Sequence, residues 1–193
     1  KIEKQMNDPE QIRRFIQQMK EDIEEVNEQL SQRNDREKRL ERERMGTTLV
    51  MTMAHFQQFF LANVGDSRCY WLTPRSCQQV TVDDDVASRE VRMGMMLHRH
   101  AVELPRAGAL TQAVGLGPSS NLHPIIQRLI VPTDSLFLLC SDGFCDHERV
   151  EQYWQEEFLP ILQGERSVDE AVPRLIDLAN RVNGHDNVSV VLV

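Results

Sequence analysis

The stretch Leu136-Phe137-Leu138-Leu139-Cys140-Ser141-Asp142-Gly143-Phe144-Cys145-Asp146 joins five apolar residues to a turn that carries two carboxylates. A short apolar run that ends at a turn signal predicts a strand buried on both faces. Ionised carboxylates beside a core are tolerated only when they are paired, hydrogen-bonded or bound to a cation. Asp142 therefore either caps a helix that follows the strand or binds a cation.

A second stretch places another carboxylate beside a strand. Gly184-His185-Asp186-Asn187 precedes Val188–Val193, a run rich in β-branched residues that predicts a further buried strand. If the two strands are antiparallel neighbours, Asp142 at the end of one meets Asp186 at the start of the other. Converging carboxylates repel each other unless a hard cation joins them, and oxygen ligands favour Mg²⁺ or Mn²⁺.

SDGFCD (residues 141–146) and GHDNVSVVLV (residues 184–193) resemble the last two motifs of the metal-dependent protein serine/threonine phosphatases, the type 2C or PPM family. Three further segments match in the family's order: Met45–Thr48, Ala62–Arg68 and Leu110–Gly115. The resemblance implies an α+β fold of two packed antiparallel β-sheets flanked by helices, an α-β-β-α sandwich. It also implies a signalling enzyme that hydrolyses phosphoserine and phosphothreonine in proteins, using water activated by two Mg²⁺ or Mn²⁺ ions.

The resemblance also implies which residues bind metal. Asp142 and Asp186 correspond to ligands of the two-metal centre. Thr81-Val82-Asp83-Asp84 fits the family's Thr-x-Asp-His segment, except that Asp84 replaces the His. Asp83 is therefore assigned, with Asp146, to a possible third, weaker metal site. No catalytic side chain is expected, because the metals activate the water.

Two features place the chain within the family's domain. Residues 86–109 correspond to the flap that borders the substrate cleft, and His98 and His100 there are expected to lie on the surface. The family's Asp-Gly-x-Gly-Gly motif and its phosphate-binding Arg, which precede the helix expected at Pro9–Gln32, do not occur in the 193 residues. We therefore expect residues 1–193 to be a single partial phosphatase domain that lacks its N-terminal part and part of the metal site. A catalytically incompetent, phosphatase-like binding or regulatory module is the alternative.

Composition narrows the class of protein. The net charge of −8 disfavours nucleic-acid binding through phosphates, and no apolar run approaches the ~20 residues of a membrane span. No secretion signal opens the chain, and four cysteines without a CxxC pair predict reduced thiols. We expect a cytoplasmic monomer whose partner is a phosphoprotein, with no nucleic-acid or membrane partner. Cys145 is interpreted as a packing residue.

The N-terminal segment, residues 9–44, is expected to form a flanking helix with a charged extension, beside a sheet core at 46–193. Asp8 is the expected N-cap, with Pro9 at the first helical position and Gln11 closing a capping box. One apolar stripe runs along the helix: Ile12, Ile16, Met19, Ile23, Val26 and Leu30. Because the heptad pattern soon lapses, a helix packed on a sheet is favoured over a coiled coil. Gln32–Arg44 is expected to be a solvated helix end or a linker.

Further strands are expected at Thr47–Met53, Phe59–Val64, Arg68–Leu72, Gln78–Val82 and Ile125–Val131. Gly65-Asp66 suggests a hairpin turn on local grounds, whereas the resemblance implies bent strand structure. A helix is expected over residues 86–100. Another follows the capping box of Ser167 and Glu170 and ends at Asn183-Gly184, with a kink or a later start at Pro173.

Overall fold

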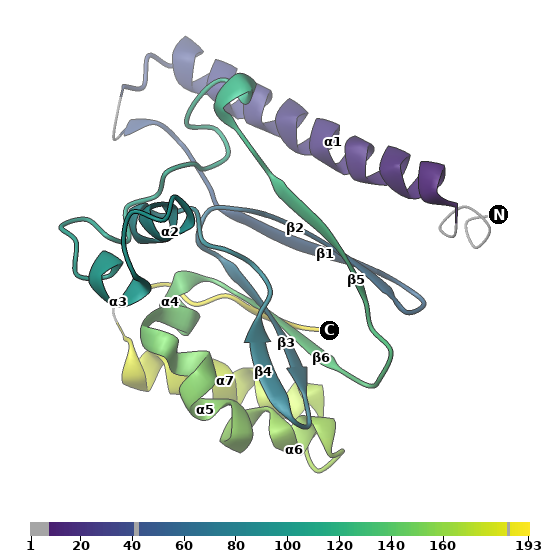
Figure 1. The fold of residues 1–193 in the computed structure, drawn as a ribbon. Coiled ribbons are helices and arrows are strands. Elements are labelled where there is room, and N and C mark those ends of the chain that lie inside the picture. The colour runs from purple at the N-terminus through teal and green to yellow at the C-terminus, as the bar shows by residue number, and fades with distance from the viewer. Residues whose placement is uncertain (1–7, 41–42, 185) are drawn as a thin grey trace. The chain divides into compact units, whose positions relative to one another are not determined.

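The computed structural model describes residues 8–40, 43–184 and 186–193 (Figure 1). The chain divides into two compact units, and each is built from two segments. The first unit contains Lys1–Gly65 and Asp84–Ile130, and the second contains Asp66–Asp83 and Val131–Val193. Each unit holds one antiparallel sheet with helices, which confirms the expected α+β class. None of the helices described is long and apolar enough to cross a bilayer.

The first unit is a three-stranded sheet in the order β1-β2-β5. Its strands are β1 (Leu49–His55), β2 (Gln58–Val64) and β5 (Ile125–Ile130). Its helices are α1 (Pro9–Arg36), α2 (Val86–Arg92), α3 (His98–Ala101) and the 3₁₀ turn η2 (Ser119–Asn121). Every residue of β2 is buried, because this strand pairs on both sides and lies under α1.

Helix α1 packs on this sheet, as its apolar stripe predicts. The Asp8 side chain accepts a hydrogen bond from the Glu10 N–H at 3.1 Å and begins the helix. Further along, Met19 and Ile23 are buried in one cluster with residues of β2. The prediction of a helix against a sheet is therefore confirmed for the first unit.

Three details of the N-terminal prediction are wrong. Val26 is 50% exposed, because it borders an open groove. The Oε1 of the Gln11 side chain is buried without a hydrogen-bond partner, so no capping box forms. Asn34, within the segment that was expected to be solvated, is fully buried near the end of the helix at Arg36.

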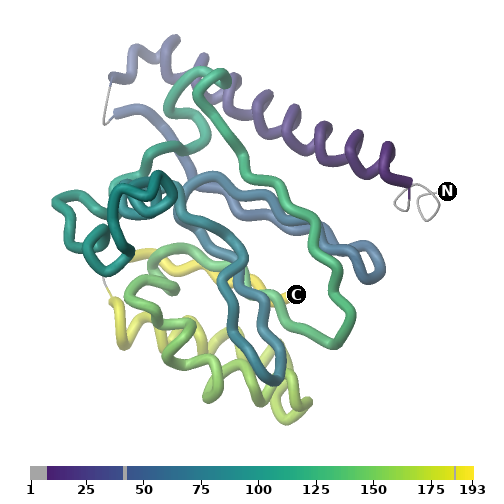
Figure 2. Tube along the Cα trace, viewed as in Figure 1, coloured from purple at the N-terminus to yellow at the C-terminus, as the bar shows by residue number. Residues whose placement is uncertain are grey.

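The burial of Asn34 follows from its hydrogen bonds to two loops. Its amide nitrogen donates to the carbonyl oxygens of Met45 and Gly115 at 2.8 and 2.9 Å, and its oxygen accepts from the Met45 N–H at 2.8 Å. Two helical turns earlier, the Asn27 side chain donates to the Gly117 carbonyl and accepts from the Gly115 N–H. The side-chain amides on the polar face of α1 therefore hold the loop at residues 115–117, which Figure 2 traces beside the helix. They do so because they satisfy the hydrogen bonds of its buried backbone groups.

The second unit is a four-stranded sheet in the order β4-β3-β6-β7. Its strands are β3 (Arg68–Thr73), β4 (Ser76–Gln79), β6 (Leu136–Cys140) and β7 (Val190–Leu192). Its helices are α4 (Asp142–Cys145), η3 (Asp146–Glu148), α5 (Arg149–Glu157), α6 (Leu159–Leu162) and α7 (Val168–Val182). All five residues of β6 are buried, as the apolar run predicts.

The connections between strands correct one prediction. Strands β2 and β3, on either side of Gly65-Asp66, belong to different sheets, so this turn is not a hairpin. The hairpins lie instead at β1–β2, where Phe56 adopts a positive φ of 52°, and at β3–β4. The β7 strand is also shorter and more exposed than predicted, because it is a sheet edge.

The helices follow the predicted caps but differ in length. The capping box of Ser167 and Glu170 is present, and α7 continues past Pro173 without a later start. Asn183 is the C-cap and Gly184 has a φ of +59°, as predicted. The helix expected over residues 86–100 is instead two short helices, because the chain turns at Gly94, whose φ is +69°. His98 and His100 are exposed, as expected.

Candidate metal centre

Asp142 lies where β6 passes into a helix. Ser141 is the N-cap residue of α4, and Asp142 is the first residue of that helix. The Asp142 carboxylate accepts a hydrogen bond from the Gly143 N–H at 2.8 Å. The side chain therefore stays close to its own backbone at the mouth of the turn.

Gly143 lets another segment approach this turn closely. A Cβ added to Gly143 would collide with the Asn187 carbonyl oxygen and lie 3.5 Å from the Cβ of Asp186. Only a residue without a side chain fits here. The close approach places the Asp186 backbone directly against the turn that carries Asp142.

The strand arrangement behind this approach was predicted. β6 and β7 are antiparallel neighbours, with Cys140 opposite Val190. Beyond the strands, the Ser141 N–H donates to the Ser189 carbonyl at 3.1 Å, and the Ser189 N–H donates to the Ser141 hydroxyl at 3.0 Å. The adjacency of the two strands is therefore confirmed, while a cation shared by Asp142 and Asp186 stays a prediction. Asp186 is exposed, and its carboxylate accepts from the Asn187 N–H at 2.7 Å.

Asp66 belongs to the same acidic group, although no role was assigned to it from the sequence. Burial, together with the negative charges of Asp142, Asp83 and Asp146, raises its pKa to about 6. Four carboxylates of the second unit thus interact electrostatically, and a bound cation would relieve their repulsion. The available signal was the matched segment Ala62–Arg68, which contains Asp66.

Asp83 has a firm protein partner. Its Oδ2 accepts from the Arg68 Nη2 at 2.7 Å and Nε at 2.9 Å, and its Oδ1 accepts from the Gln79 amide at 2.9 Å. Burial alone would lower the pKa of Arg68, but the hydrogen bonds to Asp83 outweigh it and raise that pKa. A metal at Asp83 would have to share the carboxylate with Arg68, and this assignment stays a prediction.

Asp146 begins the 3₁₀ turn η3, and its position at a metal site likewise stays a prediction. His147 and Glu148, which follow it, both adopt left-handed conformations, with φ of 61° and 58°. Such conformations are costly for residues with a side chain, and they cluster at functional sites. The strained turn fixes the direction in which the chain leaves the acidic group.

The carboxylate groups are ligands of the type that binds a hard divalent cation, but too few of those that the structure describes come together to complete its coordination. Carboxylate oxygens are the ligands that Mg²⁺ and Mn²⁺ favour. Among residues 8–40, 43–184 and 186–193, no three His, Cys, Asp or Glu side chains come together closely enough to hold a metal ion. These residues could supply part of a metal centre, and further oxygen donors are needed to complete it.

Comparison with known proteins identifies the family. Residues 1–177 match the family model described as "Protein phosphatase 2C". The chain belongs to the protein phosphatase 2C family. The curated relatives include the "Serine/threonine phosphatase stp" of Listeria welshimeri, which is 33% identical over 178 residues. That match covers 91% of this chain and 66% of the relative. PstP of Mycobacterium tuberculosis is 31% identical over 150 residues, 78% of this chain and 27% of that protein.

Solved structures of serine/threonine phosphatases show the same fold. The serine/threonine phosphatase PstP/Ppp of Mycobacterium tuberculosis matches with a TM-score of 0.68 and 28% identity, over 86% of this chain and 66% of that one. Stp1 of Staphylococcus aureus matches in fold with a TM-score of 0.77 and 24% identity, over 96% and 68%. The PstP catalytic domain was also solved in complex with two manganese ions (TM-score 0.65, 28% identity, covering 86% and 65%). The chain thus spans about two thirds of these solved chains.

The thiols of this phosphatase 2C chain are packing groups. Cys145 is fully buried, and its sulfur donates to the Ser141 carbonyl at 3.3 Å. Burial raises the pKa of the Cys69 and Cys77 thiols to about 12. The interpretation of Cys145 as a packing residue agrees with this burial, because a nucleophilic cysteine needs an accessible thiolate.

Proposed function

We propose that the chain contributes to a metal-dependent protein phosphatase that hydrolyses phosphoserine and phosphothreonine with a metal-activated water. The observation that carries the proposal is the acidic group at the end of β6, in a chain of the protein phosphatase 2C family. The acids lie on segments whose backbones are held by glycine turns and strand pairing. Such fixed carboxylates suit metal binding rather than acid–base catalysis.

The proposal gives each carboxylate a role. A bound pair of Mg²⁺ or Mn²⁺ ions lowers the pKa of a coordinated water and neutralises charge on the phosphoryl oxygens. Asp142 and Asp186 would hold the metals, and Asp83 and Asp146 would serve a third, weaker site. Arg68 fixes the orientation of the Asp83 carboxylate through its paired hydrogen bonds. The manganese ions bound to the PstP catalytic domain support this choice of metal.

A phosphopeptide assay on the complete protein tests the proposed function. We expect Mn²⁺-dependent release of phosphate from a phosphothreonine peptide. Asp142→Ala and Asp186→Ala should each reduce the metal-dependent rate by at least about 100-fold, because losing even a residue that only supports a ligand costs 10–100-fold. Asp134→Ala, which removes an exposed acid from the loop before β6, is the matched control and should retain the rate.

The outcomes separate the enzyme from the alternative. Unchanged rates in both aspartate variants would contradict the assignment of the metal centre. A complete protein that binds phosphoproteins without hydrolysing them would instead be a phosphatase-like binding module.

The remaining expectations form part of the same proposal. We propose a phosphoprotein substrate, a signalling role, a cytoplasmic location and a monomeric state, without a nucleic-acid or membrane partner. The net charge of −8 supports the lack of nucleic-acid binding, because phosphate backbones repel an acidic protein. Light scattering after size-exclusion chromatography of the complete protein tests the monomer.

A further inference from the structure

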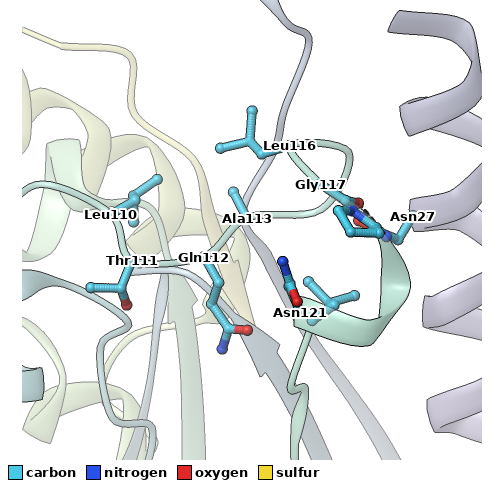
Figure 3. Close-up of a pocket in the computed structure, with 10 residues that line it drawn as sticks. Asn27, Leu110, Thr111, Gln112, Ala113, Leu116, Gly117 and Asn121 are labelled. Atoms are coloured by element: carbon cyan, nitrogen blue, oxygen red, sulfur yellow. Dashed lines mark hydrogen bonds between the residues drawn. The ribbon is translucent and has the colours of Figure 1, made fainter. Parts of the chain in front are cut away.

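In each unit, a largely buried polar side chain holds another segment by bonding to its backbone. In the first unit, the Asn27 side chain donates to the Gly117 carbonyl at 3.0 Å, beside a cavity of about 210 Å³ (Figure 3). In the second unit, the Arg68 guanidinium donates to the Cys145 carbonyl at 3.1 Å. That carbonyl ends the short helix α4, the segment that carries two acids of the candidate metal centre.

Several hydrogen bonds hold the Arg68 guanidinium in one orientation. Its Nη2 and Nε donate to the Asp83 Oδ2 at 2.7 and 2.9 Å. Its Nη1 donates to the Tyr70 hydroxyl at 3.2 Å as well as to the Cys145 carbonyl. The Arg68 side chain is 19% exposed, and both Asp83 and Tyr70 are buried. Because a guanidinium donates in several fixed directions at once, it joins segments that a single ammonium group could not.

The α4 turn links its two acids through the backbone. The Asp146 N–H donates to the Asp142 carbonyl, which closes the single turn of the helix. The last carbonyls of a helix lack partners within it. For Cys145, the last residue of α4, Arg68 supplies that partner from β3. The far end of the turn that begins at Asp142 is therefore held by a side chain from another strand.

We infer that Arg68 is a positioning residue for metal binding, which fixes the α4 turn and thereby the spacing of Asp142 and Asp146. The inference rests on the proposed function, because it assumes that these two acids bind metal. The contacts that carry it all lie within the second unit. Groups that orient metal-site residues without touching the metal typically contribute 10–100-fold in affinity. The paired bonds to Asp83 hold the guanidinium, and the bond to the Cys145 carbonyl holds the turn.

A purely electrostatic role of Arg68 would have the opposite effect on metal binding. A positive charge near a cation site repels the cation, so removal of that charge would strengthen binding. Loss of positioning would instead weaken it. The sign of the change in Mn²⁺ affinity therefore separates the two roles.

Manganese affinity of the complete protein, measured by calorimetry and by the EPR signal of free Mn²⁺, tests the inference. Arg68→Gln removes both the charge and the forked donor, and the dissociation constant for Mn²⁺ should rise ~10–100-fold. Arg68→Lys keeps the charge but cannot bond to Asp83 and the Cys145 carbonyl together, so it should also weaken binding. Each variant is measured well below its melting temperature, so that only folded protein is compared.

Arg166→Gln is the matched control. The Arg166 side chain is also 19% exposed, and its Nη1 donates to the buried Glu157 carboxylate at 2.9 Å and to the Glu157 carbonyl at 3.1 Å. Glu157 ends α5, so this substitution removes a similar ion pair and backbone contact elsewhere in the second unit. Arg166→Gln should lower the melting temperature but change the Mn²⁺ affinity by less than about twofold.

The variants distinguish positioning from a general structural role. Unchanged or tighter Mn²⁺ binding in Arg68→Gln would overturn the inference. Equal losses of affinity in Arg68→Gln and Arg166→Gln would also overturn it, because any lost ion pair would then have the same effect. Where Arg68→Gln does not fold, Arg68→Lys decides, since it keeps a charge beside Asp83. Normal affinity in Arg68→Lys would show that the forked contacts are not needed and would contradict the inference.

The wild-type protein separates this inference from the proposed function. If the wild type neither binds Mn²⁺ nor hydrolyses the phosphopeptide, the proposed function fails. If it does both and the Arg68 variants bind Mn²⁺ normally, only the inference about Arg68 fails.

Discussion

At the scale of single residues, Gly143 shows how close packing supports the candidate site. A methyl group there would collide with the Asn187 carbonyl and press on Asp186. We expect Gly143→Ala to lower the free energy of unfolding by about 1–3 kcal/mol, because overpacking forces backbone shifts. Urea denaturation of the complete protein measures this change.

Gly108→Ala is the matched control for that measurement. No atom lies within 4 Å of a Cβ at Gly108, and its φ is not in the left-handed region. The free energy of unfolding should therefore stay within about 0.5 kcal/mol of the wild-type value. Equal effects of the two substitutions would contradict the close approach at Gly143.

At the scale of elements, α1 allows the same substitution to be compared on two faces. Ile23 is 4% exposed against the sheet, whereas Val26 is 50% exposed. Ile23→Asp should destabilise the protein by about 3–5 kcal/mol, the cost of an unpaired buried charge, and Val26→Asp by less than about 1 kcal/mol. Thermal unfolding followed by circular dichroism would reveal the difference. Similarly small losses of stability in both variants would mean that the face of α1 carrying Ile23 is not buried.

Elements were predictable where local pattern and packing agree. The bounds of β6 follow from its apolar run and turn, and the capping box of α7 from Ser167 and Glu170. The length of β7 was not predictable, because only its position at a sheet edge limits its pairing. Asn34 reads as a solvated polar residue, yet it is buried by hydrogen bonds to loops that lie 11 and 81 residues away.

The residues of the candidate site likewise divide into those that the sequence makes predictable and those that it does not. Asp142 and Asp186 stand out in the sequence because each lies in a glycine-containing turn next to a predicted strand. Asp66 and Arg68 do not, since their importance arises from other segments: Arg68 meets Asp83 across 15 residues and Cys145 across 77. No local pattern encodes such pairs.

At the scale of the whole molecule, all four cysteines and both tryptophans lie in the second unit. The pKa of Cys69 is raised to about 12 by burial, so its thiolate fraction at pH 8 is roughly 10⁻⁴. We expect the native protein to react slowly with Ellman's reagent, and all four of these thiols to react once guanidinium unfolds it. Because a raised pKa leaves less thiolate at any lower pH, acidification should slow the reaction further. Rapid labelling of the native protein at Cys69 would contradict this burial.

The division into two units, each made of two chain segments, has a consequence for biosynthesis. While the ribosome synthesises the chain, β1 and β2 can form their hairpin early, but the first sheet lacks β5 until Ile130 emerges. The second sheet waits longer still, because β3 has no β6 partner until about residue 140 and β6 has no β7 partner until about residue 192. Unpaired strand edges are exposed during this interval, and such edges are prone to aggregation. The nascent chain therefore depends on slow, distant pairings, and molecular chaperones would protect it most while β3 awaits β6.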